Sequence, residues 1–197
     1  MNIFAKVILS SNKKITDKLV KNLELIQKEN NQDYDIFVKM GGEFHTVLIN
    51  QKSTDIEKGI DFVFSNFEVV NFYNIGTCLS IDSIDLKFGD VIVPNTIINK
   101  NDDVIFLENF TDKNYDLNKF GLVLNGICLT LDEKIQDEDE LLEIKNDYNC
   151  DIFDFEAYLI GKMIEKLNKE TKFGVVKIIG DDEEHFGNVV DILEFFM

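Results

Sequence analysis

The feature of this chain that most constrains its fold is the alternation of short apolar runs with longer amphipathic segments. Residues 3–9 form an apolar run with the length of a buried strand, and residues 174–179 form another near the far end. Segments with a helical spacing of apolar side chains lie between them. Strands that alternate with helices in this way are typical of an α/β domain.

The remaining segments extend the pattern. Apolar residues at spacings of 4, 4 and 3 predict a first helix, and its stripe consists of Ile15, Leu19, Leu23 and Ile26. We expect further strands at residues 35–40, 45–50, 68–74, 90–98 and 122–130, and further helices at 54–67, from 137, at 155–168 and at 189–196. Gly41-Gly42 predicts a hairpin between the first two of these strands. Thr54 and Glu57 resemble a capping box. The sequence therefore predicts a three-layer α/β fold, with a twisted mixed central sheet covered by helices on both faces, as a single domain over residues 1–197.

Charge and cysteine usage narrow the function classes. The chain carries 37 acidic and 20 basic residues for a net charge of −17, and every basic residue is a lysine. Such a surface repels phosphate backbones, so we expect no binding to nucleic acid. No apolar run reaches the roughly 20 residues that span a bilayer, and the first lysines follow the N-terminal apolar stretch, the reverse of a signal peptide. Three cysteines without CxxC spacing predict reduced thiols in a cytoplasmic protein.

Ligands of α/β sheets bind beyond the carboxyl ends of the strands, so polar residues just after strands are the first candidates. Asp181, Asp182 and Glu184 follow the strand expected at residues 174–179. One interpretation is a solvated acidic loop. The other is that like charges crowd one carboxylate and raise its pKa into the range of a general acid. A metal site at His185 is the weaker reading, and we expect neither a metal nor a cofactor.

Two further stretches admit a structural and a functional reading. Asp154 suits a helix N-cap and Glu156 suits the first turn, yet Glu156 could instead be buried and accept hydrogen bonds from a polyol such as ribose. A glycine turn follows the strand at residues 68–74 and places Thr77 and Cys78 at its end. In the stretch from Thr130 to Asp132 a hydroxyl and a carboxylate again follow a strand, where a turn or cap role is the simpler one.

Together these stretches resemble the nucleoside phosphorylase/nucleosidase family, which includes purine and uridine phosphorylases and methylthioadenosine/S-adenosylhomocysteine nucleosidases. The family's glycine motif is similar to residues 75–79 followed by the strand at 89–93. Its ribose signature resembles residues 154–158, its TxD segment residues 130–132, and its catalytic strand end residues 179–181 with Glu184. Four motifs in the right order cover about residues 70–196.

This resemblance implies roles for particular residues. Glu156 would hold the ribose 2′- and 3′-hydroxyls, and Asp181 would donate a proton to N7 of a purine leaving group. Phe155, Thr77, Cys78, Thr130 and Asp132 lie in the matching substrate-binding motifs. The resemblance also implies a homodimer.

The departures from the family pattern decide between activities. Phosphorylases of the family clamp phosphate with arginines, which this chain lacks, so water is the expected acceptor. The leading hypothesis is a nucleosidase that acts on an adenosine-type nucleoside such as methylthioadenosine or S-adenosylhomocysteine. Asn12 lies near the place of the glutamate that activates water in the nucleosidases, with Glu43 as an alternative carboxylate, and Lys134 replaces a base-stacking Phe. These replacements leave open a degenerate member that binds a nucleoside with little or no activity, and a phosphorylase is the third alternative.

Overall fold

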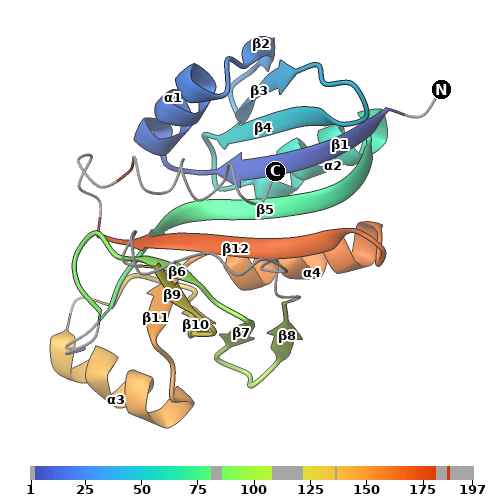
Figure 1. Cartoon of the computed structure of the whole chain (residues 1–197). Coiled ribbons are helices and arrows are strands. Elements are labelled where there is room, and N and C mark those ends of the chain that lie inside the picture. The colour runs from blue at the N-terminus through green and yellow to red at the C-terminus, as the bar shows by residue number, and fades with distance from the viewer. Residues whose placement is uncertain (1–2, 81–85, 108–121, 136, 181–185, 187–197) are drawn as a thin grey trace.

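A large mixed sheet forms the centre of the computed structural model, which describes residues 3–80, 86–107, 122–135, 137–180 and 186 (Figure 1). Its strands, in spatial order, are β2 (Ile26–Asn30), β3 (Tyr34–Lys39), β4 (His45–Gln51), β1 (Phe4–Ser10), β5 (Glu68–Cys78), β12 (Lys172–Ile179), β6 (Val91–Val93) and β9 (Leu122–Leu124). The four central strands, β4, β1, β5 and β12, run parallel. Antiparallel pairs join β2 to β3, β3 to β4 and β12 to β6. The predicted hairpin of β3 and β4 is thus confirmed.

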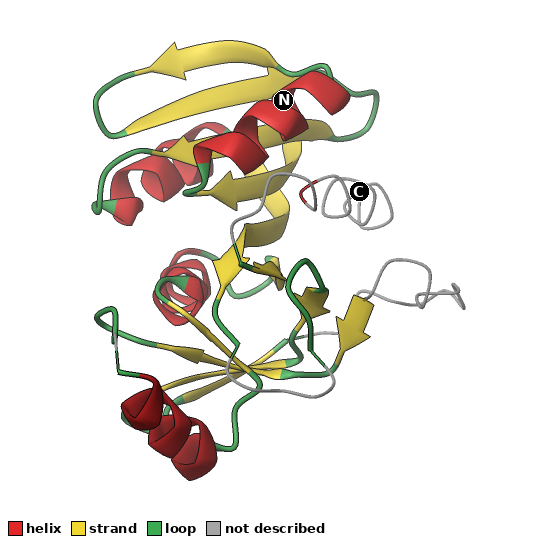
Figure 2. Ribbon diagram, turned by 90° about the vertical axis from the view of Figure 1, so that its left-hand side faces the viewer, coloured by secondary structure: helices red, strands yellow, loops and turns green. Residues whose placement is uncertain are grey.

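A second, four-stranded sheet lies below the large one in Figure 2. Its strands, in spatial order, are β11 (Ile152–Asp154), β10 (Ile127–Thr130), β7 (Thr96–Asn99) and β8 (Val104–Phe106). The first three run parallel and β8 is antiparallel to β7. A bridge between Leu79 and Phe153, with both backbone hydrogen bonds at 2.9 Å, attaches β11 just beyond the end of β5. The ends of β5 and β11 therefore meet.

Helices cover both faces of the large sheet, because successive side chains of a strand point to opposite faces. Ile8 of β1 packs with Ile15 and Leu19 of α1 (Lys13–Asn22) on one face. Val7 and Leu9 pack on the other face in a cluster that includes residues of α2 (Ile56–Asn66) and α4 (Ala157–Leu167). Helix α3 (Glu138–Tyr148) packs against the second sheet. The predicted three-layer α/β fold with a mixed sheet is confirmed, and none of the helices in the described ranges is long and apolar enough to cross a membrane.

The first predicted helix ends earlier than its apolar stripe indicates. Glu24 adopts a left-handed conformation with φ 54°, and the backbone N–H of Leu25 donates to the carbonyl of Val20 at 2.9 Å. These contacts terminate α1, and Ile26 begins β2 with 65% of its side chain exposed. The assignment of Ile26 to the helix was wrong because a spacing of three continues the helical pattern past a left-handed C-terminal turn.

Two segments predicted as single strands each divide between the two sheets. Pro94 separates β6 from β7, and Asn125, with φ 69°, separates β9 from β10. The two corners are joined, since the N–H of Asn125 donates to Val93 and that of Asn95 donates to Gly126. Proline cannot donate to a strand ladder, so a break there is physically expected. Both segments turn the corner together and leave the large sheet for the small one.

The predicted helix starts have mixed outcomes. Asp137 caps α3, because its side chain accepts from the backbone N–H groups of Asp139 and Glu140. The capping box at Thr54 does not form: α2 begins at Ile56, its N-cap residue is Asp55, and that cap makes no side-chain hydrogen bond. The helix predicted at residues 189–196 lies outside the described residues.

Candidate functional site

A group of polar side chains, most of them buried, gathers where the parallel strands approach the start of α4. We call this group the Glu156 cluster, and its members are Ser11, Asn74, Thr130, Asp154, Glu156 and Lys177. Strands β1, β5 and β12 lie side by side in Figure 1; Asn74 lies in β5, Lys177 lies in β12, and Ser11 directly follows β1. The second sheet supplies Thr130 and Asp154. The cluster thus joins both sheets and one helix.

Lys177 is the buried cation of the cluster. Its Nζ lies 2.8 Å from Oδ2 of Asp154 and 3.4 Å from Oε1 of Glu156, and its side chain is 1% exposed. Burial alone lowers the pKa of Lys177, but the negative charges of Asp154 and Glu156 outweigh that effect and raise the pKa above its ordinary value. The lysine therefore stays charged, and two carboxylates share one ammonium with a net charge of −1.

Asp154 accepts a hydrogen bond from the backbone at the start of α4, so the Glu156 side chain is not needed to cap this helix. Oδ2 of Asp154 accepts from the N–H of Ala157 at 2.9 Å, and its Oδ1 accepts from the hydroxyl of Thr130 at 2.6 Å. The Thr130 hydroxyl oxygen in turn accepts from the N–H of Tyr158 at 3.0 Å. Glu156 occupies the N-cap position but makes no side-chain capping bond. Its carboxylate is consequently free to turn into the cluster.

The two oxygens of Glu156 have different surroundings. Oε1 faces inward, where it accepts from Nδ2 of Asn74 at 2.9 Å and lies 3.4 Å from Lys177. Oε2 accepts from the hydroxyl of Ser11 at 2.8 Å. The Glu156 side chain is 12% exposed and Ser11 is exposed, so the Oε2 side faces solvent. As far as the described residues show, Glu156 is therefore open to a ligand on the side of Ser11.

Asn74 and Gly76 shape the inner wall beside Glu156. Asn74 is fully buried, and because its Nδ2 faces a carboxylate, its Oδ1 must point elsewhere. No donor among the described residues reaches that Oδ1. A Cβ added at Gly76 would lie 3.4 Å from both Oε1 of Glu156 and Nζ of Lys177. The glycine thus lets the charged groups lie close to the backbone of β5.

The predicted site residues divide into those inside this cluster and those outside it. Thr130 and Glu156 belong to it. Asn12 does not, since its Oδ1 caps α1 by accepting from the N–H groups of residues 14 and 15 at 3.0 and 3.3 Å. Phe155 is 41% exposed between two cluster residues, and Asp132 is exposed after β10. Asp181 lies outside the described residues, directly after Gly180.

Thr77 and Cys78 end β5. Thr77 is half-buried, and Cys78 is buried, with 3% of its surface exposed. Burial raises the pKa of Cys78 to about 12, although the charge of Lys177 acts in the opposite direction. The pKa of Cys128 is also raised well above the ordinary value, chiefly by burial. These thiols are therefore protonated at neutral pH, which removes them as nucleophiles.

The sequence interpretation missed Lys177, Asn74 and Ser11. A signal for Lys177 was present, because one lysine interrupts the apolar strand of residues 174–179. Along β12 its side chain alternates with Val176 and Ile178, which pack toward α1, so Lys177 points to the opposite face. A cation within an apolar strand needs a buried counter-ion, and carboxylates at residues 154 and 156 were available. No comparable pattern marks Ser11.

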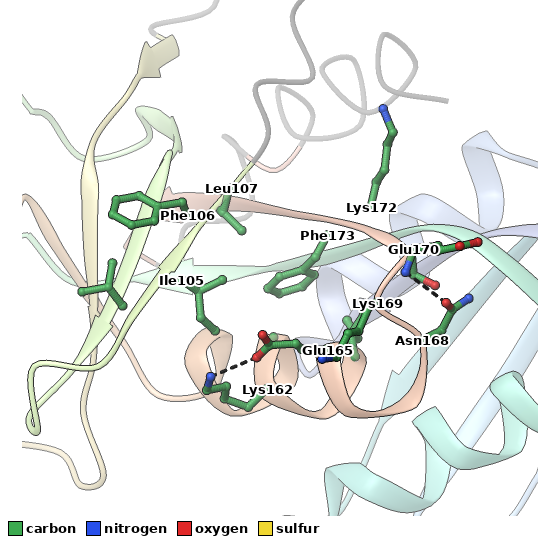
Figure 3. A pocket seen from close by; sticks show the side chains of 14 residues that line it. Ile105, Phe106, Leu107, Lys162, Glu165, Asn168, Lys169, Glu170, Lys172 and Phe173 are labelled. Atoms are coloured by element: carbon green, nitrogen blue, oxygen red, sulfur yellow. Dashed lines mark hydrogen bonds and ion pairs between the residues drawn. The ribbon is translucent and has the colours of Figure 1, made fainter.

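A separate cavity of about 540 Å³ lies near the far end of α4 and the start of β12 (Figure 3). Ile105, Phe106 and Phe173 form part of its apolar wall, and an ion pair between Lys162 and Glu165 crosses its helical side at 2.9 Å. It contains none of the predicted site residues and no member of the Glu156 cluster. The described part of the chain also holds no group of His, Cys, Asp and Glu residues suited to a metal ion. The Glu156 cluster is therefore the candidate functional site.

The fold matches solved nucleosidases over the whole chain, although no protein-family model and no curated protein sequence matches it. The apo 5′-methylthioadenosine nucleosidase of Arabidopsis thaliana is 15% identical with a TM-score of 0.72, and the alignment covers 100% of this chain and 97% of that one. The S-adenosylhomocysteine nucleosidase of Streptococcus pyogenes, in complex with 5-methylthiotubericidin, is 15% identical with a TM-score of 0.79 and the same coverages. Futalosine hydrolase of Helicobacter pylori is 12% identical with a TM-score of 0.75, covering 100% and 98%. The chain therefore has the nucleosidase fold of the family that its motifs resemble.

Proposed function

We propose that this protein is a nucleosidase that hydrolyses the N-glycosidic bond of a purine nucleoside. The observation that carries the proposal is the partly buried carboxylate of Glu156, held by Asn74 of β5 and Lys177 of β12 with one oxygen toward solvent. Its place in a nucleosidase fold supports the role of a ribose ligand. The substrates to test first are 5′-methylthioadenosine, S-adenosylhomocysteine and futalosine.

The charge of the cluster suits the chemistry of glycosidic cleavage. When the bond to the base breaks, positive charge develops on the ribosyl group and negative charge on the departing base. A carboxylate at the sugar hydroxyls stabilises the first charge, and its partners hold it in place beforehand. Asp181 is proposed to protonate the base at N7 and so relieve the second charge.

Water is the proposed acceptor of the ribosyl group. A phosphorylase needs a cationic clamp for phosphate, and the chain contains no arginine. In the cluster, the single cation Lys177 is already shared by two carboxylates. A phosphate beside this net negative group would be repelled.

The position of Asn12 favours a second candidate, a nucleoside-binding protein of weak activity. Its amide oxygen accepts two backbone hydrogen bonds at the start of α1, which leaves the NH₂ group to face other partners. An NH₂ group donates hydrogen bonds and cannot take a proton from water. If no other base acts, base release is slower by about 10²–10⁴-fold, the usual contribution of general-base catalysis.

The test is release of free base from the nucleoside panel, with and without phosphate, followed by chromatography. We expect phosphate-independent release that falls by about 10²–10³-fold in Glu156→Gln, the usual loss when one preorganised electrostatic contact is removed. Glu143→Gln is the matched control, since Glu143 is exposed on α3. Release that requires phosphate, or equal rates in both variants, would contradict the hydrolase. Binding without any release would favour the second candidate.

We also propose a homodimer in the cytoplasm. The dimer follows from the family resemblance alone, and light scattering after gel filtration measures it directly. The three cysteines are thiols buried in the fold, which suits a reducing compartment.

A further inference from the structure

We infer that Ser11 is a specificity-determining residue of this site. Its hydroxyl oxygen accepts a hydrogen bond from one of two neighbouring ligand hydroxyls, while Oε2 of Glu156 accepts from the other. The inference rests on the proposed function and adds a requirement to it, namely an unsubstituted vicinal diol. Ser11 lies outside every motif on which the family resemblance was based.

The first step is that, among the described residues of the Glu156 cluster, one pair of oxygens faces solvent. Oε1 of Glu156 is directed inward to Asn74 and Lys177, both of which are buried. Oε2 is directed to the exposed Ser11, whose Oγ lies 2.8 Å away. The solvent side of the cluster therefore presents two oxygens one hydrogen bond apart.

The second step is an account of the protons. An ionised carboxylate offers no donor, so while the bond from Ser11 to Glu156 is kept, the single proton of the Ser11 hydroxyl lies between Oγ and Oε2. Oγ keeps its remaining lone-pair capacity, and Oε2 can accept further bonds as well. Both oxygens can therefore only accept from a ligand. A ligand that fits must supply two donors whose oxygens are about as close as Oγ and Oε2.

Two hydroxyls on adjacent ring carbons, held cis, meet this requirement. Each can donate its proton, and their oxygens are spaced similarly to the two acceptors. An ether, a phosphate ester or a carboxylate at either place offers no donor. Its oxygen would then face Oγ of Ser11 or Oε2 of Glu156 without a hydrogen between the two acceptors. The net negative charge of Asp154, Glu156 and Lys177 adds repulsion against an anionic group.

The third step is that Ser11 is held in place before a ligand arrives. The strand that precedes it is fixed by the pairing of Leu9 in β1 with Asn74 in β5. Ser10 is fully buried, and its Oγ accepts from the N–H of Asn12 at 3.3 Å. Asn12 in turn caps α1. A hydroxyl fixed between a strand end and a capped helix loses little freedom on binding, which favours specific recognition.

The experiment is a cycle that combines a side-chain change with removal of one ligand hydroxyl. Calorimetry measures the dissociation constants of C-nucleoside analogues of adenosine, in which a carbon–carbon bond replaces the N-glycosidic bond, in the ribo, 2′-deoxy and 3′-deoxy forms. Wild type is compared with Ser11→Ala, with Ser11→Thr, which keeps a hydroxyl, and with Ser65→Ala as the control, since Ser65 is exposed on α2.

We expect Ser11→Ala to weaken the ribo form by about 2- to 12-fold, the usual range for one neutral hydrogen bond. Removal of the ligand hydroxyl that donates to Ser11 should weaken binding to wild type but should not weaken binding to Ser11→Ala any further. Removal of the other hydroxyl should cost the same in both. Ser11→Thr should restore the wild-type pattern and Ser65→Ala should keep it, which a general structural defect would not do.

The outcomes separate the inference from the function on which it rests. If nucleosides bind and both deoxy penalties are identical in wild type and Ser11→Ala, the specificity role is refuted and the nucleosidase proposal stands. If no nucleoside binds, methyl β-D-ribofuranoside is titrated into the same proteins. Binding that depends on Ser11 would then support diol recognition without the nucleosidase, and no binding would overturn both.

Discussion

Replacement of Lys177 by methionine should destabilise the protein strongly, because it leaves two carboxylates without their shared cation. Methionine fills a similar volume but removes the charge that lies 2.8 Å from Asp154 and 3.4 Å from Glu156. Asp154 is 1% exposed and would keep neutral hydrogen-bond donors, among them Thr130 and the N–H of Ala157, but no cation from Lys177. Removing one partner of a buried ion pair costs about 3–5 kcal/mol. We expect a loss of that size in the free energy of unfolding.

Urea denaturation followed by circular dichroism measures this loss. The double variant Asp154→Asn/Lys177→Met should recover part of the loss, since it removes the fully buried carboxylate together with its partner.

Lys162→Met is the matched control for this change. Lys162 pairs with Glu165 at 2.9 Å, so the ion pair is as short as that of Lys177, but both side chains are about half exposed. Exposed ion pairs contribute little to stability. The reasoning would be refuted if Lys162→Met and Lys177→Met lowered the free energy of unfolding equally, or if the double variant were less stable than Lys177→Met alone.

Three further predictions follow from the described contacts and the family resemblance. Asn12→Ala removes the cap of α1 and should cost about 1 kcal/mol in urea denaturation, whereas Asn12→Asp should keep it; equal losses would contradict the capping role. Since burial raises the pKa of Cys78 to about 12 from an ordinary 9.0, its thiol contributes stability that is complete below pH 9 and is lost as the pH rises toward 12. The free energy of unfolding should fall over that interval, and a disulfide reagent at pH 8 should label the buried thiols only after denaturation. Asp181→Asn should slow base release by about 10²–10⁴-fold and Asp182→Asn much less, so equal effects would show that another carboxylate is the acid.

Periodicity predicted the layers of this fold because burial of a strand or helix face is a local property of the sequence. The stripe through Ile15 and Leu19 and the apolar run before Ser10 both lie where they were expected. The two corners at Pro94 and Asn125 were missed, since a strand that leaves one sheet for another keeps its apolar pattern. The second sheet was therefore not predicted, and the single-domain assignment stays a prediction.

The site was predicted less completely than the fold, for a physical reason. Glu156 and Thr130 stood out because each follows an apolar segment in a motif. Ser11, Asn74 and Lys177 act through contacts across 145, 82 and 21 positions with Glu156, and no local pattern encodes such pairings. Asn12 and Ser11 are neighbours in the chain, yet the geometry at the end of β1 turns one toward a helix and the other toward Glu156.

The retention of charge at Lys177 is better explained by recognition than by stability. Replacing both partners of a buried ion pair by apolar side chains often leaves the free energy of unfolding unchanged or raises it. Leucine or methionine side chains could therefore stabilise the fold about as well as the ion pair does. Here the cation also lies against Glu156, a residue that α4 does not need as a cap because Asp154 already serves it. An apolar group at position 177 would leave Oε1 of Glu156 with Asn74 alone and weaken its fixed orientation. We therefore propose that the charge of Lys177 serves to hold Oε2 of Glu156 beside Ser11, where a diol can reach it.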